Sequence, residues 1–230
     1  MKCELCQSNI NHQWQLREWQ LRDFYDFSVY KQPFICEMCY DNFQQIDPQI
    51  ACLECQGVTV GKYCVDCQQW FKQGFPKIHN QSLFKYDSQM KRYFKAYKFE
   101  GGYHLRDVFK QAIQQRLIKA NVDMIVPIPI TTDTFLERQF NQVTGWLEGI
   151  PFDEILICRE VRKDKQSRKT RRERLLMKQP FTLCQSDKKL ANQKICLVDD
   201  VYTTGRTLRH AAQCLIVAGA LEVTSLTLAR

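Results

Sequence analysis

The sequence predicts an α/β protein, with a parallel sheet flanked by helices and a small zinc-ribbon module at its N-terminus. Two observations carry this prediction. Residues 195–198 are four apolar residues in a row, followed by two aspartates and a hydroxyl-rich loop that opens an amphipathic helix, as expected for a buried parallel strand. The first third of the chain holds four Cys-x-x-Cys pairs, the spacing of zinc knuckles. We therefore expect a cysteine-rich zinc-binding module over residues 1–75 and an α/β domain over residues 76–230.

The eight paired cysteines predict two tetrahedral zinc sites. A two-residue gap lets both sulfurs of a knuckle reach one zinc ion at about 2.3 Å, and two knuckles close a structural site. The short loop between the last two pairs makes one site from Cys52, Cys55, Cys64 and Cys67. The remaining pairs form the second expected site, from Cys3, Cys6, Cys36 and Cys39. Interleaved pairing of the knuckles and redox-active thiols stay open as alternatives.

Composition favours a cytoplasmic protein with an anionic partner. No apolar run of the 230 residues reaches the ~20 that span a bilayer, and no secretory signal is visible. The twelve cysteines are therefore expected to be thiols or metal ligands. Much of the formal net charge of +8 lies in residues 162–174, where eight basic residues accompany two acidic ones. Such a segment favours an anionic partner, although a solvated loop is the plain alternative.

The chain between these two regions alternates strand and helix patterns. Strands are expected over residues 82–86, 124–129 and 155–158. One helix is expected to start at a cap formed by Asp87 or Ser88. Another helix is expected over about residues 105–119, where apolar side chains recur in helical register. This alternation of elements agrees with the α/β prediction.

A ligand site is expected where the strand over residues 195–198 ends. Asp199 and Asp200 come next, and open parallel sheets bind ligands beyond the carboxyl ends of their strands. The loop that follows combines hydroxyls with a glycine: Thr203, Thr204, Gly205, Arg206 and Thr207. Hydroxyls and the free N–H groups of a helix N-terminus suit a phosphate, whereas the carboxylates suit sugar hydroxyls. A ribose 5-phosphate satisfies both ends, and a tight turn that only starts a helix is the alternative.

This run resembles the signature of type I phosphoribosyltransferases, which bind phosphoribosyl pyrophosphate (PRPP). The resemblance implies their fold for the α/β domain. It also implies that Asp199 and Asp200 are the catalytic pair, holding the ribose 2′- and 3′-hydroxyls, and that residues 203–207 cradle the 5′-phosphate. A Mg²⁺ ion would bridge the diphosphate if the protein transfers phosphoribosyl groups.

The order of motifs along nearly the whole chain resembles the ComF competence proteins, which join a zinc finger to a phosphoribosyltransferase-like domain. Residues 97–101, Tyr-Lys-Phe-Glu-Gly, match their Tyr-Lys-Phe-x-Gly segment. Residues 138–142, Arg-Gln-Phe-Asn-Gln, stand where the family has Arg-Gly-Phe-Asn-Gln. The resemblance implies that Lys98 and Arg138 belong to the phosphate site. Gln139 replaces the family's glycine and is expected to crowd backbone amides that would meet the pyrophosphate.

The same resemblance implies a role in natural transformation, where imported single-stranded DNA is bound and processed. It implies a mobile catalytic loop at the basic segment. Because this segment is the densest cationic stretch of the chain, Arg171, Arg172 and Arg174 are the expected DNA contacts. The expected partners are single-stranded DNA, PRPP or a related ribose phosphate, and a ComFA-like helicase or ATPase that could bring the protein to the inner face of the membrane. Two other functions stay open: a working phosphoribosyltransferase of unknown acceptor, and a non-catalytic adaptor that docks the helicase.

Overall fold

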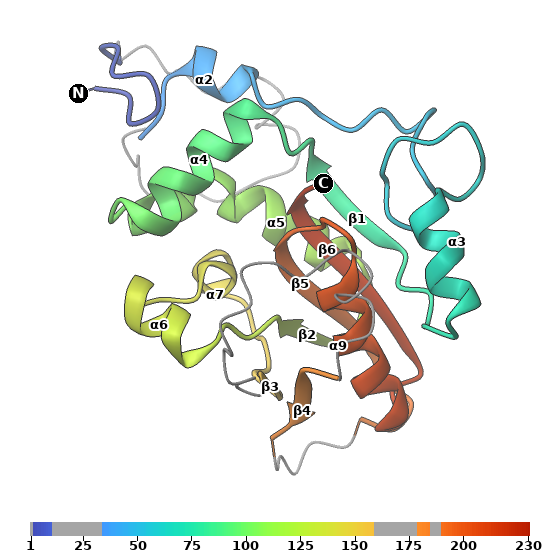
Figure 1. The fold of residues 1–230 in the computed structure, drawn as a ribbon. Helices are drawn as coiled ribbons and strands as arrows, with labels where there is room; N and C mark the ends of the chain where they lie inside the picture. Colours follow the sequence, from blue (N-terminus) through green and yellow to red (C-terminus); the bar gives the residue numbers. More distant parts are fainter. Residues whose placement is uncertain (1, 11–33, 159–178, 185–189) are drawn as a thin grey trace, which may run out of the picture.

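The main sheet contains four parallel strands in the order β1, β6, β5, β2 (Figure 1). The computed structural model describes residues 2–10, 34–158, 179–184 and 190–230. The strands are β1 (Asn80–Phe84), β2 (Met124–Pro127), β5 (Lys194–Val201) and β6 (Glu222–Ala229). Helices cover both faces of this sheet, so the predicted α/β fold with a flanked parallel sheet is confirmed.

Strand β5 differs in one respect from the expectation. It runs to Val201, and Asp199 pairs in parallel register with Thr227 of β6. The two aspartates are therefore held by the sheet itself, whereas the sequence pattern placed them in the connection that follows. Ladder pairing restricts the backbone of both residues, so their side chains start from a rigid element.

The expected strand over residues 155–158 lies outside the main sheet. It is β3 (Leu156–Cys158), which pairs antiparallel with β4 (Phe181–Leu183) in a separate two-stranded sheet. Short apolar runs predict a strand but carry no information on its pairing partner. The expected strands over residues 82–86 and 124–129 correspond to β1 and β2, with shifts of about two residues at their ends.

One face of the sheet packs against several helices. Cys196 and Val198 of β5 point into this core, because alternate residues of a strand face opposite sides. The helices that supply the rest of this core are α4 (Ser88–Phe99), the 3₁₀ helix η1 (Tyr103–Arg106), α5 (Asp107–Lys119) and α7 (Gln142–Leu147). The Asp87 carboxylate accepts a hydrogen bond from the amide of Met90 at 2.9 Å, which confirms the predicted cap of α4. Helix α6 (Thr132–Arg138) precedes α7.

The other face of the sheet packs against α9 (Arg206–Val217). Ile195 and Leu197 of β5 meet the apolar stripe of this helix, which includes Leu208 and Leu215. Spacing of three and four residues puts such side chains on one side of a helix, as the sequence pattern indicated. Among the described residues, every helix is too short or too polar to cross a membrane.

The cysteine-rich segment contributes to both cores. Its two helices are α2 (Glu37–Asp41) and α3 (Val65–Lys72). Phe43, after α2, packs against Phe109 of α5 with ring centroids 4.9 Å apart, whereas Cys67 and Ile78 pack in the α9 core. In Figure 1, α2 lies beside α4, and α3 lies on the other side of β1. The boundary near residue 75 stays a prediction, but side chains from both sides of it share each core.

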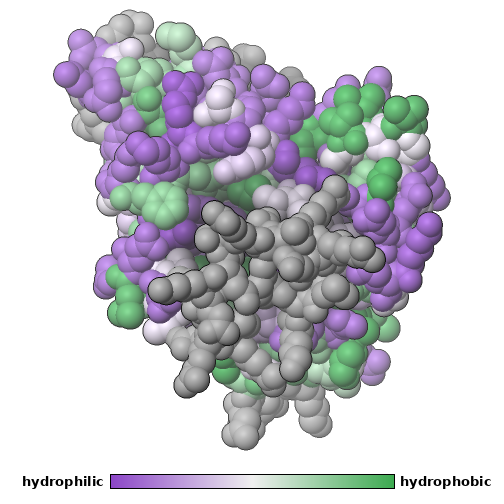
Figure 2. Space-filling model, viewed as in Figure 1, coloured by the Kyte–Doolittle hydropathy of each residue, from purple (hydrophilic) through white to green (hydrophobic). Residues whose placement is uncertain are grey.

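The surface around the loop before α3 is unusually apolar. Figure 2 shows this area as a group of hydrophobic side chains beside polar surroundings. The exposed apolar residues of this part of the chain are Ile50, Leu53, Val58, Val60 and Val65. They are neighbours in sequence of the cysteines at 52, 55 and 64. Where short loops converge on a cluster of cysteines, little volume remains to bury such side chains, so they stay at the surface.

Candidate functional site

A tight loop of residues 203–207, here called the hydroxyl loop, connects β5 to α9. Gly205 is the N-cap of α9 and has a left-handed backbone, with φ of +74°. A Cβ atom at this position would lie 2.0 Å from the hydroxyl oxygen of Tyr202. Only glycine fits here, because any side chain would meet both steric strain and the Tyr202 ring. The sequence pattern placed Gly205 in the expected phosphate loop, and the structure adds this packing requirement.

The hydroxyl loop presents free backbone donors at the start of a helix. Among the residues that the structure describes, the amides of Thr203, Thr204 and Gly205 donate to no protein group. Helix α9 has 12 residues, so its N-terminus carries the partial positive charge of a helix dipole. A left-handed residue next to such amides makes a concave surface that suits an anion. The loop can therefore receive a phosphate group.

Asp200 forms the centre of a hydrogen-bonded network. Its Oδ2 accepts a short ion-pair contact from Lys98 Nζ and a hydrogen bond from Gln142 Nε2 at 2.8 Å. Arg138 Nη1 donates to Gln142 Oε1 at 2.9 Å. The side chains of Lys98 and Asp200 are only 12% and 15% exposed, so their attraction is weakly screened. The structure thus brings two of the predicted basic residues, from the ends of α4 and α6, to the predicted aspartate.

Gln142 is the residue of this network that sequence reasoning did not assign. It connects Asp200 to Arg138 and is itself buried at the start of α7. The sequence did point to Gln142, because it is the last residue of the Arg-Gln-Phe-Asn-Gln run that resembles the family motif. Asn141, one residue earlier, accepts from the amide of Val143 at 2.9 Å and caps α7. This cap fixes the first turn of α7 and so directs Gln142 toward Asp200.

Gln139 occupies a position that favours glycine. Its φ of +66° lies in the left-handed region, which costs a residue with a side chain about 1 kcal/mol. Its amide donates to Phe135 O at 2.6 Å and ends α6, and its side-chain nitrogen donates to Leu136 O at 2.6 Å. The side chain therefore folds back along α6, and the amide at this position is already used by the helix end.

Asp199 sits in a less favourable environment for a charge than Asp200. Burial raises the pKa of Asp199, and the neighbouring charge of Asp200 raises it further, to about 8. A hydrogen bond from the amide of Asp200, at 2.8 Å, and the charge of Lys98 offset part of this effect. In the unliganded protein near neutral pH, Asp199 therefore retains its proton.

We expect Asp199 to make the unliganded protein less stable as pH rises. The unfolded chain releases this proton near pH 4 and the folded protein near pH 8, so the free energy of unfolding falls between these values by up to about 1.4 kcal/mol per pH unit. Asp199→Asn should be more stable than the parent, by a margin that grows from about pH 5 to about pH 8. Urea unfolding across this range tests it. A stability difference that does not change with pH would contradict the expectation.

The paired cysteines form two clusters of four sulfur atoms. The first cluster contains Cys3, Cys6, Cys36 and Cys39, and the second contains Cys52, Cys55, Cys64 and Cys67, with the ligand atoms of each within 4.8 Å of one another. This grouping confirms the sequential pairing of knuckles and excludes the interleaved one. The Sγ atoms of Cys55 and Cys64 are 3.6 Å apart, close to the ~3.8 Å edge of a tetrahedron with Zn–S bonds of about 2.3 Å.

Backbone amides also prepare the second cluster for a metal. Gly57 N donates to Cys55 Sγ at 3.4 Å, and Cys64 N donates to Cys52 Sγ at 3.2 Å. Such donors stabilise thiolates and orient metal ligands. Four thiolates in this arrangement are the donor set of structural zinc, and both clusters fit that ion. The predicted DNA contacts Arg171, Arg172 and Arg174 lie outside the described residues.

Fold and site together define a protein of the phosphoribosyltransferase class. A phosphoribosyl transferase domain model matches residues 100–230. The chain is 34% identical over 196 residues to the Competence protein ComFC of Streptococcus pneumoniae (strain ATCC BAA-255 / R6), covering 85% of this chain and 87% of that protein. It is 32% identical over 205 residues to the Competence protein ComFC of Bacillus subtilis (strain 168), covering 85% and 84%. The chain belongs to the ComFC family of competence proteins.

Proposed function

We propose that this protein binds PRPP or a related ribose 5-phosphate where β5 ends, and that it binds single-stranded DNA during natural transformation. One observation carries the first part. Two carboxyl groups at the end of β5 and the free amides of the hydroxyl loop lie on one short segment before α9. The carboxyl groups suit the ribose hydroxyls, and the amides suit the 5′-phosphate.

The charges around the aspartates support an anionic ligand. Asp200 is paired with Lys98, and the raised pKa of Asp199 keeps that group neutral near pH 7. The aspartate pair therefore carries little net negative charge, and a phosphate ester is not repelled strongly from it. Arg138 adds a positive charge next to Gln142. In this proposal Lys98 and Arg138 face the diphosphate of PRPP, and Mg²⁺ accompanies that ligand.

The competence role is supported by family membership. Both relatives described above are named competence proteins, and the chain carries a formal net charge of +8. A cationic protein binds single strands largely by releasing the counterions of the phosphates. A cytoplasmic location and a ComFA-like helicase or ATPase as partner belong to the same proposal.

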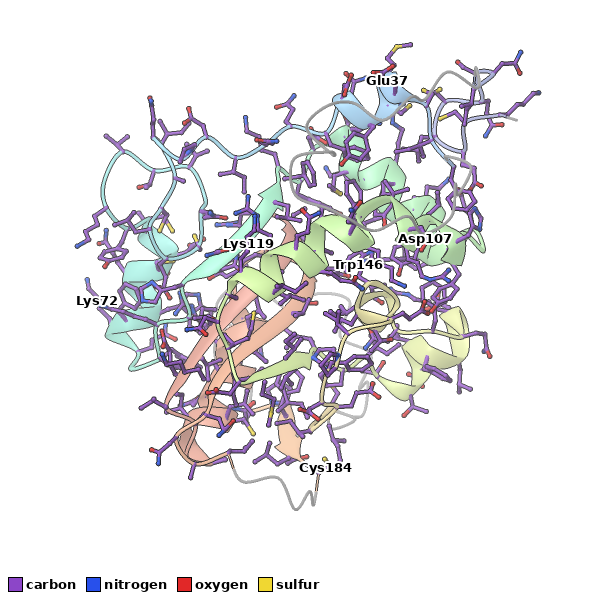
Figure 3. The ribbon with its side chains drawn as sticks, turned by 180° about the vertical axis from the view of Figure 1, so that it is seen from behind. Glu37, Lys72, Asp107, Lys119, Trp146 and Cys184 are labelled. Carbon is purple, nitrogen blue, oxygen red and sulfur yellow. The ribbon has the colours of Figure 1, made fainter. Side chains whose placement is uncertain are left out.

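Calorimetry with PRPP and Mg²⁺ tests the ligand. The parent protein should bind PRPP. Asp200→Ala should weaken binding by about 1.5–3 kcal/mol, the scale of a hydrogen bond involving a charged group, and Asp199→Ala, which removes a neutral carboxyl, by about 0.5–1.5 kcal/mol. Asp107→Ala, at the start of α5 (Figure 3), is a control carboxylate outside the network and should bind like the parent. If the parent protein gives no heat of binding and no thermal shift with PRPP, the proposal is contradicted. Release of pyrophosphate with single-stranded DNA present would favour the transferase alternative.

Salt-dependent titrations test the DNA part. If about four cations contact one strand and each releases ~0.7 counterions, log affinity should fall with log salt at a slope near −3. Changing Arg171, Arg172 and Arg174 together to alanine should weaken binding across sequences and make this slope shallower. A matched triple variant removes three exposed cations elsewhere, Lys91, Lys95 and Arg116. If the two triple variants have the same DNA affinity and the same slope of log affinity against log salt, the basic segment does not belong to the DNA site.

A further inference from the structure

We infer that the second cluster, through Arg230 and Trp70, holds the hydroxyl loop in the conformation that receives a phosphate. The inference concerns the same loop as the proposed function and rests on it. It makes Arg230 and Trp70 positioning residues, which act on a ligand through the backbone of the loop. It also gives the zinc ion expected in the second cluster a role in ligand binding besides its role in folding.

Arg230 connects the second cluster directly to the loop. Its Nη2 donates to Cys55 Sγ at 3.4 Å and its Nε donates to Cys55 O at 3.1 Å. On the other side of the same guanidinium, Nη1 donates to Thr203 O at 2.8 Å and to Tyr202 O at 3.3 Å. A Cβ atom at position 57 would lie 2.5 Å from Nη2, so Gly57 provides the space for this contact. One rigid, planar group therefore spans the cluster and the loop.

Trp70 makes a second connection. It lies in α3 three residues after Cys67 and is only 2% exposed. Its indole Nε1 donates to Thr204 O at 2.9 Å. Arg209, in the first turn of α9, adds a third connection, because its Nη2 lies 3.6 Å from Cys67 Sγ and 3.5 Å from the Tyr202 hydroxyl. Together with Arg230, these contacts join α3, Cys55 and Cys67 to the residues on both sides of Gly205.

The direction of these bonds explains their effect on the loop. In a trans peptide the carbonyl and the following N–H point to opposite sides. The carbonyls of Tyr202, Thr203 and Thr204 all accept bonds from Arg230 or Trp70, so the amides of Thr203, Thr204 and Gly205 must point away from the cluster. These are the amides that donate to no protein group among the described residues. The contacts thus select the loop conformation in which three N–H groups remain free for an anion.

Two single variants and one matched control test this connection. Trp70→Phe keeps a buried ring but loses the donor to Thr204, and Arg230→Gln loses the guanidinium that bridges Cys55 and Thr203. Each should weaken binding of ribose 5-phosphate about fivefold, the effect of one lost hydrogen bond, and should speed hydrogen exchange of residues 203–205. Trp146→Phe also removes a buried indole donor, to the Tyr93 hydroxyl at 3.4 Å, on α7 away from α3 (Figure 3). It should match the parent in both measurements.

Zinc affinity gives a second readout. Coupling between the binding free energies of two sites is reciprocal, so saturating ribose 5-phosphate should tighten zinc binding in the second cluster about fivefold, measured at equilibrium with a competing chelator, and leave the first cluster unchanged. The double variant with Trp70→Phe and Arg230→Gln should lose this tightening. Full zinc content in each variant verifies that the clusters are intact.

The outcomes separate the inference from the proposed function. Parent-like affinity and parent-like hydrogen exchange in both single variants would overturn the inference. If the parent binds no ribose 5-phosphate, the proposed function fails, and hydrogen exchange of the unliganded variants still decides whether the second cluster orders the loop. Faster exchange at residues 203–205 then supports the positioning contacts, and unchanged exchange rejects them.

Discussion

Replacing Cys67 with serine should unfold the protein well beyond the cysteine-rich segment. Cys67 is 1% exposed and shares a core with Leu208 and Leu215 of α9. Binding of a structural zinc ion contributes on the order of 10 kcal/mol to folding, which is comparable to the total stability of a domain. Loss of the second cluster therefore removes a support of α9 itself, and the sheet face beneath that helix should open with it.

Zinc content and thermal unfolding by circular dichroism measure this effect together. The variant should contain about one zinc ion fewer per chain, since four ligands are needed to close a structural site. Cys196→Ser is the matched control, because Cys196 is buried in β5 but belongs to neither cluster. The control should keep its zinc and lose only about 1–2 kcal/mol, the cost of burying a hydroxyl. A Cys67→Ser variant with a parent-like melting temperature would contradict the conclusion that α9 depends on the core it shares with the second cluster.

Arg209→Met should destabilise the protein by about 3–5 kcal/mol, because it removes the buried guanidinium that compensates the charge of the Glu54 carboxylate. Arg209 and Glu54 are both 0% exposed, with Arg209 Nη2 and Glu54 Oε1 3.2 Å apart. Glu54 Oε1 also accepts from the amide of Ile78 at 2.7 Å, and Arg209 Nη1 donates to Pro76 O at 2.8 Å. The pair therefore joins α9 to the knuckle between Cys52 and Cys55 and to the segment that follows the second cluster.

Urea unfolding of the two single variants and the double variant isolates the pair energy. Glu54→Gln keeps an acceptor for Ile78, so the double variant with Arg209→Met should recover a large part of the loss. Such recovery is the signature of an uncompensated buried charge, as opposed to lost packing volume. Equal instability of Arg209→Met and the double variant would assign the effect to packing alone.

The arrangement of the two cysteine clusters around the sheet has a single physical basis. The first cluster shares a core with α4 and α5, and the second shares a core with α9. A small polar segment cannot bury enough apolar surface to fold by itself. By packing on both sides of the sheet, it uses the cores of the larger domain, and a bound metal would fix only the loops between them.

The sequence by itself determined the segment from β5 to α9 and the cysteines that make up the two clusters. Both are local patterns: an apolar run followed by Asp199, Asp200 and residues 203–207, and cysteines spaced to reach one ion. Short-range spacing fixes which side chains can meet on one turn or one knuckle. For this reason Asp87 as the cap of α4 and the apolar stripe of α9 were also predictable.

Only the tertiary structure decided how these parts meet. The bonds of Trp70 to Thr204 and of Arg230 to Cys55 join residues 134 and 175 positions apart, and a side-chain donor to a distant carbonyl leaves no pattern in the sequence. The pairing of β3 with β4, the knuckle pairing and the place of Gln142 between Asp200 and Arg138 depend in the same way on the packing of whole elements. Local propensity specifies each element, whereas the shared cores select which of their side chains come into contact.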